Sequence, residues 1–164
     1  MIERRRRHPL YCFLRENYFR IVNPIKRTYW FIMKPKTRGV KAVVTHSNQF
    51  LLVRIGYAHK RWTLPGGQVE RNEDFKTAAM RELREETGVV VNEMTYLDSC
   101  FSTLHHKRDT VQYFTAESAD TELIIDDQEI VDAGWFARSL LPEERNPSVD
   151  RGIAMYDKHI HVHE

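Results

Sequence analysis

Residues 66–89 read GGQVERNEDFKTAAMRELREETGV, and this stretch is the part of the sequence that best indicates the fold. Its second half predicts an amphipathic helix from Asp74 to Thr87, because apolar residues recur at helical spacing along one side. The Asp74 side chain is suited to cap the first turn, and Gly88 can take the left-handed conformation just after the last turn. The apolar side consists of Phe75, Ala78, Ala79 and Leu83.

Three glutamates stand at i, i+3 and i+4 on this expected helix, so their carboxylates share one face: Glu82, Glu85 and Glu86. Like charges stacked in this way repel one another, and a merely solvated face would interleave lysines. Several oxygen ligands together are what a hard divalent ion such as Mg²⁺ or Mn²⁺ requires. Gly66 and Gly67 permit a tight loop whose backbone carbonyl can face such an ion.

Arg81 directly precedes these glutamates in the sequence. Its side chain can reach back to Glu73, near the helix start, or forward to Glu85. Either ion pair would help to hold the carboxylate-bearing helix against the loop that precedes it.

The spacing of these residues resembles the complete signature of the Nudix hydrolases. Five residues separate Gly67 from Glu73, and seven separate Glu73 from the run RELREETGV that begins at Arg81. The resemblance extends over about residues 39 to 145 and excludes the segment before them. Further similarity lies in a lead-in, a closing loop and a strand: residues 62–67, 128–130 and 134–136.

The resemblance implies an α/β fold: an α/β/α sandwich with a mixed central sheet. It also implies Mg²⁺-dependent hydrolysis, with Mn²⁺ as a substitute, of a nucleoside diphosphate linked to another group. In the family pattern Arg81 and Glu73 orient the catalytic groups. The metal ligands would be the Gly66 carbonyl and the carboxylates of Glu82, Glu85 and Glu86.

The general base is left open by the same resemblance, because family members place it at one of two positions. These positions correspond to Glu82 on the helix and to Glu129 in a later loop. Other acids in that later stretch compete with Glu129 for the role: Glu122, Asp126 and Asp127.

The substrate needs cations for its phosphates, and we expect Arg54 or Arg61 to clamp a bridging phosphate. Trp62 is a candidate for stacking on a nucleotide base, and Gly67 is a candidate for contacting the substrate. Nucleotide sugars or ADP-ribose-like molecules are the favoured substrates. The alternatives are nucleoside triphosphates, 5′-triphosphate RNA, or a nucleotide-sensing binding module without turnover.

The remaining pattern predicts strands around the signature and a closing helix. The expected strands are residues 40–45 and 50–54 as a hairpin, then 62–64, 89–91, 95–101, 110–115 and 134–137. A final helix is expected over residues 147–158, followed by an exposed disordered tail that carries His159, His161 and His163.

Composition limits the class of protein. The 164 residues suit one domain at roughly 150 residues per domain. With 41% hydrophobic and 29% charged residues, the chain has an ordinary globular composition. No apolar run approaches the ~20 residues of a membrane span. Two cysteines, Cys12 and Cys100, make no disulfide framework and favour a reducing cytoplasm.

Charge is distributed unevenly and marks a separate N-terminal arm. Residues 1–38 hold eleven Lys or Arg against two Glu, whereas residues 39–164, the expected catalytic domain, are net acidic. Apolar residues at helical spacing from Leu10 to Ile25 predict a basic amphipathic helix in the arm. Three roles fit it: packing on the body or on a second subunit of a homodimer, lying on anionic lipid, and contacting nucleic acid. The first is favoured.

Overall fold

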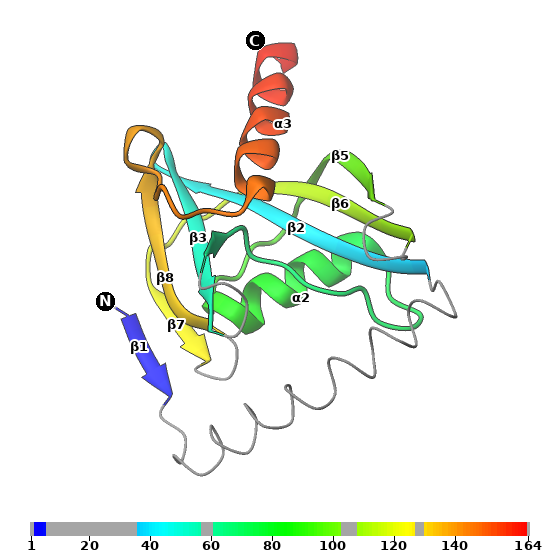
Figure 1. Ribbon diagram of the computed structural model, residues 1–164. Helices are drawn as coiled ribbons and strands as arrows, with labels where there is room; N and C mark the ends of the chain where they lie inside the picture. Colours follow the sequence, from blue (N-terminus) through cyan, green and yellow to red (C-terminus); the bar gives the residue numbers. More distant parts are fainter. Residues whose placement is uncertain (1, 6–35, 57–60, 103–107, 127–129, 164) are drawn as a thin grey trace.

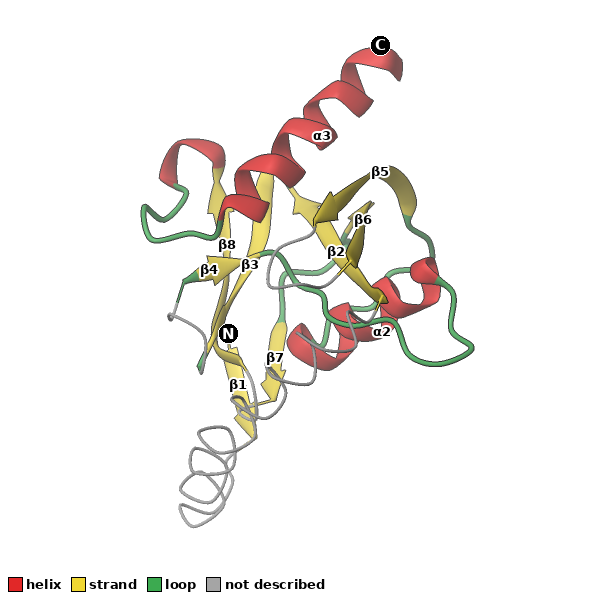
Figure 2. Cartoon of the chain, turned by 45° about the vertical axis from the view of Figure 1, so that its right-hand side comes forward, coloured by secondary structure: helices red, strands yellow, loops and turns green. Residues whose placement is uncertain are grey.

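The fold is described from a computed structural model over residues 2–5, 36–56, 61–102, 108–126 and 130–163. A mixed six-stranded sheet lies between helix α2 (Phe75–Thr87) and helix α3 (Pro147–His163), as Figures 1 and 2 show. This is the α/β sandwich with a mixed sheet that the sequence predicts.

The sheet has the strand order β4-β3-β2-β6-β5, and β8 also pairs with β3. Its strands are β2 (Lys36–His46), β3 (Gln49–Ile55), β4 (Trp62–Thr63), β5 (Thr95–Ser102), β6 (Arg108–Glu117) and β8 (Ile130–Ala137). A separate two-stranded parallel sheet joins β1 (Ile2–Arg5) to β7 (Leu123–Asp126), and a short 3-10 helix, η2 (Arg138–Leu140), follows β8.

The expected hairpin is present, but β2 and β3 pair with each other only next to the turn. The pairs are Thr45 with Phe50 and His46 with Gln49. Further from the turn, β2 no longer pairs with β3. The segment that follows β4 takes the place of β3 and forms hydrogen bonds with β2. The N–H of Ala42 donates to the Pro65 carbonyl at 2.9 Å, and the N–H of Val40 donates to the Gly67 carbonyl at 3.0 Å. The loop that contains Gly66 and Gly67 is therefore held in the middle of the sheet.

Gly66 is required at its position for steric reasons. Its φ is +132°, which residues with a Cβ rarely adopt, and a Cβ there would stand 2.2 Å from the Val40 carbonyl oxygen. The close approach of the loop to β2 is thus possible only because residue 66 has no side chain.

Helix α2 has the ends that its sequence predicts. The Asp74 carboxylate accepts the Thr77 N–H at 3.0 Å, and Gly88 has a φ of 74° and donates its N–H to the Arg84 carbonyl at 2.9 Å. Ala78, Ala79 and Leu83 are fully buried, so the apolar side of the helix faces the sheet.

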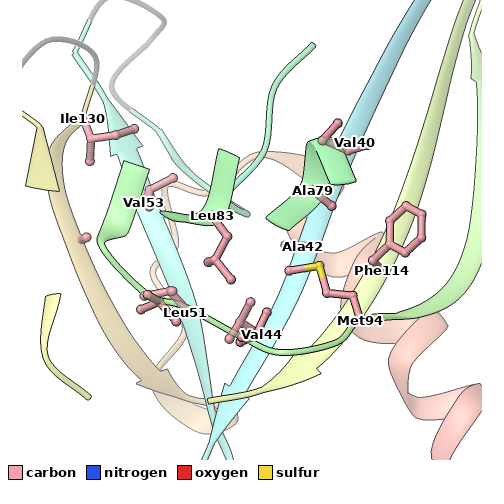
Figure 3. Close-up of a cluster of buried hydrophobic side chains, with 14 of the residues drawn as sticks. Val40, Ala42, Val44, Leu51, Val53, Ala79, Leu83, Met94, Phe114 and Ile130 are labelled. Atoms are coloured by element: carbon pink, nitrogen blue, oxygen red, sulfur yellow. The ribbon is translucent and has the colours of Figure 1, made fainter. Parts of the chain in front are cut away.

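Two apolar clusters hold the layers together, because side chains alternate between the faces of each strand. Leu51 and Val53 of β3 belong to the cluster beneath α2, part of which Figure 3 shows. Phe50 and Leu52, from the same strand, belong to the cluster beneath α3, which contributes Val149 and Ile153. The sheet is therefore covered by a helix on each face.

The sequence analysis erred at several elements. Residues 89–91 are not a strand, although Val89 and Val91 are buried in the α2 cluster. β1 and β7 were not anticipated. α3 continues to His163, so the expected disordered tail is helical.

The boundary expected at residue 39 falls inside β2, which begins at Lys36. The helix expected in the basic arm from Leu10 onward lies outside the described residues. Within the described part of the chain, none of the helices combines the length and apolarity that crossing a membrane demands.

Replacing Gly66 with alanine should destabilise the protein by about 3 kcal/mol or more, because the new Cβ meets backbone at an unfavourable φ. The matched control is Gly67→Ala, whose Cβ would lie nearest to the movable end of the Glu82 side chain. Urea denaturation measures both variants. A Gly66→Ala protein within about 1 kcal/mol of wild type would contradict the steric argument.

Candidate active site

Arg81 joins the glutamates to the preceding loop. Its Nε and Nη2 donate to the two carboxylate oxygens of Glu73 at 2.9 and 3.0 Å. Its Nη1 donates to Glu82 at 2.9 Å and to Glu85 at 3.1 Å. Nη2 also donates to the Gln68 carbonyl at 3.1 Å. Both partners that the sequence analysis named for Arg81, Glu73 and Glu85, are thus engaged at once.

This network changes the acidity of its members. The hydrogen bond from Arg81, with a further one from the Glu70 N–H, lowers the pKa of Glu73. Hydrogen bonds to the carboxylates of Glu73, Glu82 and Glu85 raise the pKa of Arg81. The guanidinium therefore stays charged at any pH at which the protein folds. Only 18% of the Arg81 side chain and 12% of the Glu73 side chain are exposed, so solvent screens this pair weakly.

The two loop glycines position Glu82 and Glu86. A Cβ on Gly67 would lie 2.6 Å from the carboxylate carbon and oxygens of Glu82, so the carboxylate rests directly on the glycine backbone. The Gly66 N–H donates to Glu86 Oε2 at 2.9 Å. The loop and the helix are thus connected through both glutamates as well as through Arg81.

Lys41 of β2 also belongs to this site, although the sequence analysis did not name it. Its Nζ donates to the Leu64 carbonyl at 2.8 Å and to the Gly66 carbonyl at 3.1 Å. The pKa of Lys41 is lowered, chiefly by burial, and the nearby charges of Glu86 and then Glu82 oppose this shift. The available signal was a single charged residue inside the apolar run of residues 40–44.

The chemistry of the donor groups fits a divalent metal. All of the donors are hard oxygen ligands at one end of the loop–helix junction: the carboxylates of Glu82, Glu85 and Glu86 and the Gly66 carbonyl. Among the described residues, no three acidic, histidine or cysteine side chains converge as a formed metal centre. Glu85 is the group free to adjust, because 54% of its side chain is exposed.

Arg54 and Trp62, both expected to bind substrate, contact each other. Arg54 donates to the Asp132 carboxylate at 2.9 Å, and its guanidinium carbon lies 5.4 Å from the centre of the Trp62 ring. The Trp62 ring packs edge-on against Phe136, with centroids 4.8 Å apart. Sequence reasoning missed Asp132, and a phosphate would have to compete with it for Arg54.

Two of the expected residues remain. Arg61 is exposed and lines a cavity of about 440 Å³ together with Glu143, Glu144 and Arg145. Glu129, the second candidate for the general base, lies outside the described residues.

Comparison with known proteins identifies relatives of this arrangement. Residues 35–156 match the NUDIX domain family. The chain is 34% identical over 73 residues to an asymmetrical bis(5′-nucleosyl)-tetraphosphatase of Caenorhabditis elegans, covering 42% of the chain and 53% of that protein. It is 34% identical over 80 residues to an 8-oxo-dGTP diphosphatase of Proteus vulgaris, covering 48% of the chain and 71% of that protein. It thus spans about half the length of the first relative.

The fold is similar to that of a solved structure, a MutT NUDIX hydrolase from Burkholderia pseudomallei. The TM-score is 0.66 at 23% identity, over 74% of this chain and 97% of that one.

Substituting Arg81 by methionine should lower the free energy of unfolding by roughly 2–4 kcal/mol at neutral pH, because partly buried carboxylates lose their partner. The effect should depend on pH. The folded-state pKa of Glu73 lies below its ordinary value of 4.5, so the pair stabilises the fold above that pH and loses this contribution as pH falls through the folded-state pKa.

Urea denaturation between pH 7 and pH 3 checks this expectation. The difference between wild type and Arg81→Met should shrink on acidification. Arg84→Met, on the exposed side of α2, is the control. A difference that stays constant across this range would exclude Glu73 as the titrating partner.

Proposed function

The chain belongs to the NUDIX family, and from that premise we propose that it is a metal-dependent pyrophosphohydrolase. Its substrate would be a nucleoside diphosphate joined to a second group. The observation that carries the proposal is the network around Arg81, which holds the glutamate face of α2 against the loop at Gly66 and Gly67. A bound divalent ion would activate water and offset charge at the phosphorus.

The proposed residue roles follow from these contacts. Glu82, Glu85 and Glu86 are proposed metal ligands, with the Gly66 carbonyl as a further donor. Arg81 orients two of these carboxylates, and Glu73 in turn orients Arg81. Hydrolysis adds water to a phosphorus and breaks the bridging P–O bond, so a carboxylate must also accept one proton from the water.

The substrate class is proposed at the level that the relatives share. A dinucleoside tetraphosphate and 8-oxo-dGTP, named for the two curated relatives, both contain a phosphoric anhydride next to a nucleoside. The nucleotide-sugar and ADP-ribose-like substrates favoured by the sequence analysis contain the same linkage. A panel of these four kinds of compound, with nucleoside triphosphates and 5′-triphosphate RNA, tests the proposal by product release with Mg²⁺ and with chelator. If none of the compounds in the panel is cleaved, the result would favour the alternative of a nucleotide-sensing binding module.

On the best substrate of the panel, Glu85→Gln and Glu86→Gln should each lower turnover by at least about a hundredfold, because each removes a charged ligand. Stability should change by less than about 1 kcal/mol. Glu85 is largely exposed, and a glutamine at position 86 can still accept the Gly66 N–H. Glu93→Gln, whose side chain is 78% exposed, is the matched control. Unchanged turnover in both variants would overturn the assignment of these ligands.

The proposed base, Glu82 or Glu129, can be identified by separating turnover from metal binding. Loss of a base that is not a ligand lowers kcat and leaves Mn²⁺ affinity intact, whereas loss of a ligand weakens both. If Glu129 is the base, Glu129→Gln should behave in the first way and Glu82→Gln in the second. Titration with Mn²⁺ monitored by electron paramagnetic resonance gives the affinities. A Glu129→Gln variant with wild-type kcat would exclude Glu129 and leave Glu82 and the neighbouring acids Glu122, Asp126 and Asp127 as candidates.

A further inference from the structure

Lys41 contacts the candidate active site from β2, through the Gly66 carbonyl. The residue follows Val40 and precedes Ala42 in β2, and both of these neighbours are buried in the cluster beneath α2. Its Nζ donates to the Leu64 and Gly66 carbonyls. The carboxylates whose charges act on it are Glu86 and Glu82. The Gly66 carbonyl, itself a proposed metal ligand, thus accepts a hydrogen bond from Lys41.

The hydrogen bonds of Lys41 are not needed to hold the loop in place. Backbone bonds from Val40, Ala42 and Val69 tie the loop segment to β2 at 2.9–3.0 Å. The Gly66 N–H is held in addition by Glu86. Removal of the Lys41 head group should therefore change the charge of the site much more than the position of the loop.

We propose that the Lys41 ammonium group weakens the affinity of this site for a free divalent metal ion. The inference rests on the proposed function, since it concerns the same carboxylates. A positive charge among the ligands repels a divalent ion and attracts the phosphates of a substrate. Lys41 thereby favours binding of the metal together with the substrate over binding of the metal alone. Its role is positioning and electrostatic, because it acts through the ligands.

The test measures Mn²⁺ binding to the full-length protein without substrate, by electron paramagnetic resonance. Lys41→Met removes the charge and the donor, whereas Lys41→Gln removes the charge and keeps a donor. Both should bind Mn²⁺ roughly tenfold more tightly than wild type, because one repelling charge is gone. Lys76→Met, which removes an exposed α2 lysine paired with Glu93, is the control and should leave the affinity unchanged.

The outcomes are distinguishable. Unchanged or weaker Mn²⁺ binding in both Lys41 variants, with measurable binding in wild type, overturns this inference and leaves the proposed function standing. No Mn²⁺ binding in wild type, together with silence across the substrate panel, overturns the proposed function and this inference with it. Tighter binding in only one of the two variants would assign the effect to hydrogen bonding rather than charge, and would also overturn it. Thermal unfolding confirms that each variant is folded.

Discussion

The backbone pairing between the Pro65–Gly67 segment and β2 is the constraint on which the rest of the site depends. β2 and β3 share only two residue pairs next to their turn, so the donors of β2 beyond that point need other acceptors. The carbonyls of Pro65 and Gly67 supply them. Because Gly66 alone permits this approach, one residue without a side chain determines how closely the loop lies against β2.

Electrostatics explains why the helix tolerates three glutamates on one face. Arg81 donates to Glu82 and Glu85 from the same helix and to Glu73 from the loop, so one permanently charged group offsets much of the repulsion. The third glutamate, Glu86, accepts the Gly66 N–H. The planar guanidinium serves several carboxylates at once, which a lysine ammonium does less well. The arrangement thus couples the charge of the helix to the placement of the loop. A merely solvated acidic face would need neither Glu73 nor the glycines.

Local signals were predictable from the sequence, and long-range pairings were not. The caps of α2 at Asp74 and Gly88 depend on adjacent residues, and both were predicted correctly. The apolar residues 89–91 were wrongly expected to be a strand, because a run of buried valines does not reveal whether a pairing partner exists. β7 was missed because its apolar residues lie in an acidic stretch. Lys41 was missed because its partners are 23 and 25 residues away in the chain.

Under the proposed function, the charges of the site explain the order in which a metal and a phosphate would bind. Four carboxylates face two cations, which leaves two negative charges, the amount that one divalent ion offsets. The groups counted are Glu73, Glu82, Glu85, Glu86, Arg81 and Lys41. Before that ion binds, the excess of carboxylates repels a phosphate group, and afterwards it no longer does. Arg54 cannot remove this barrier alone, since Asp132 already balances its charge. Under the proposed function, charge balance would make the metal a condition for phosphate binding, and the charge of Lys41 would set how much of the imbalance a metal must correct.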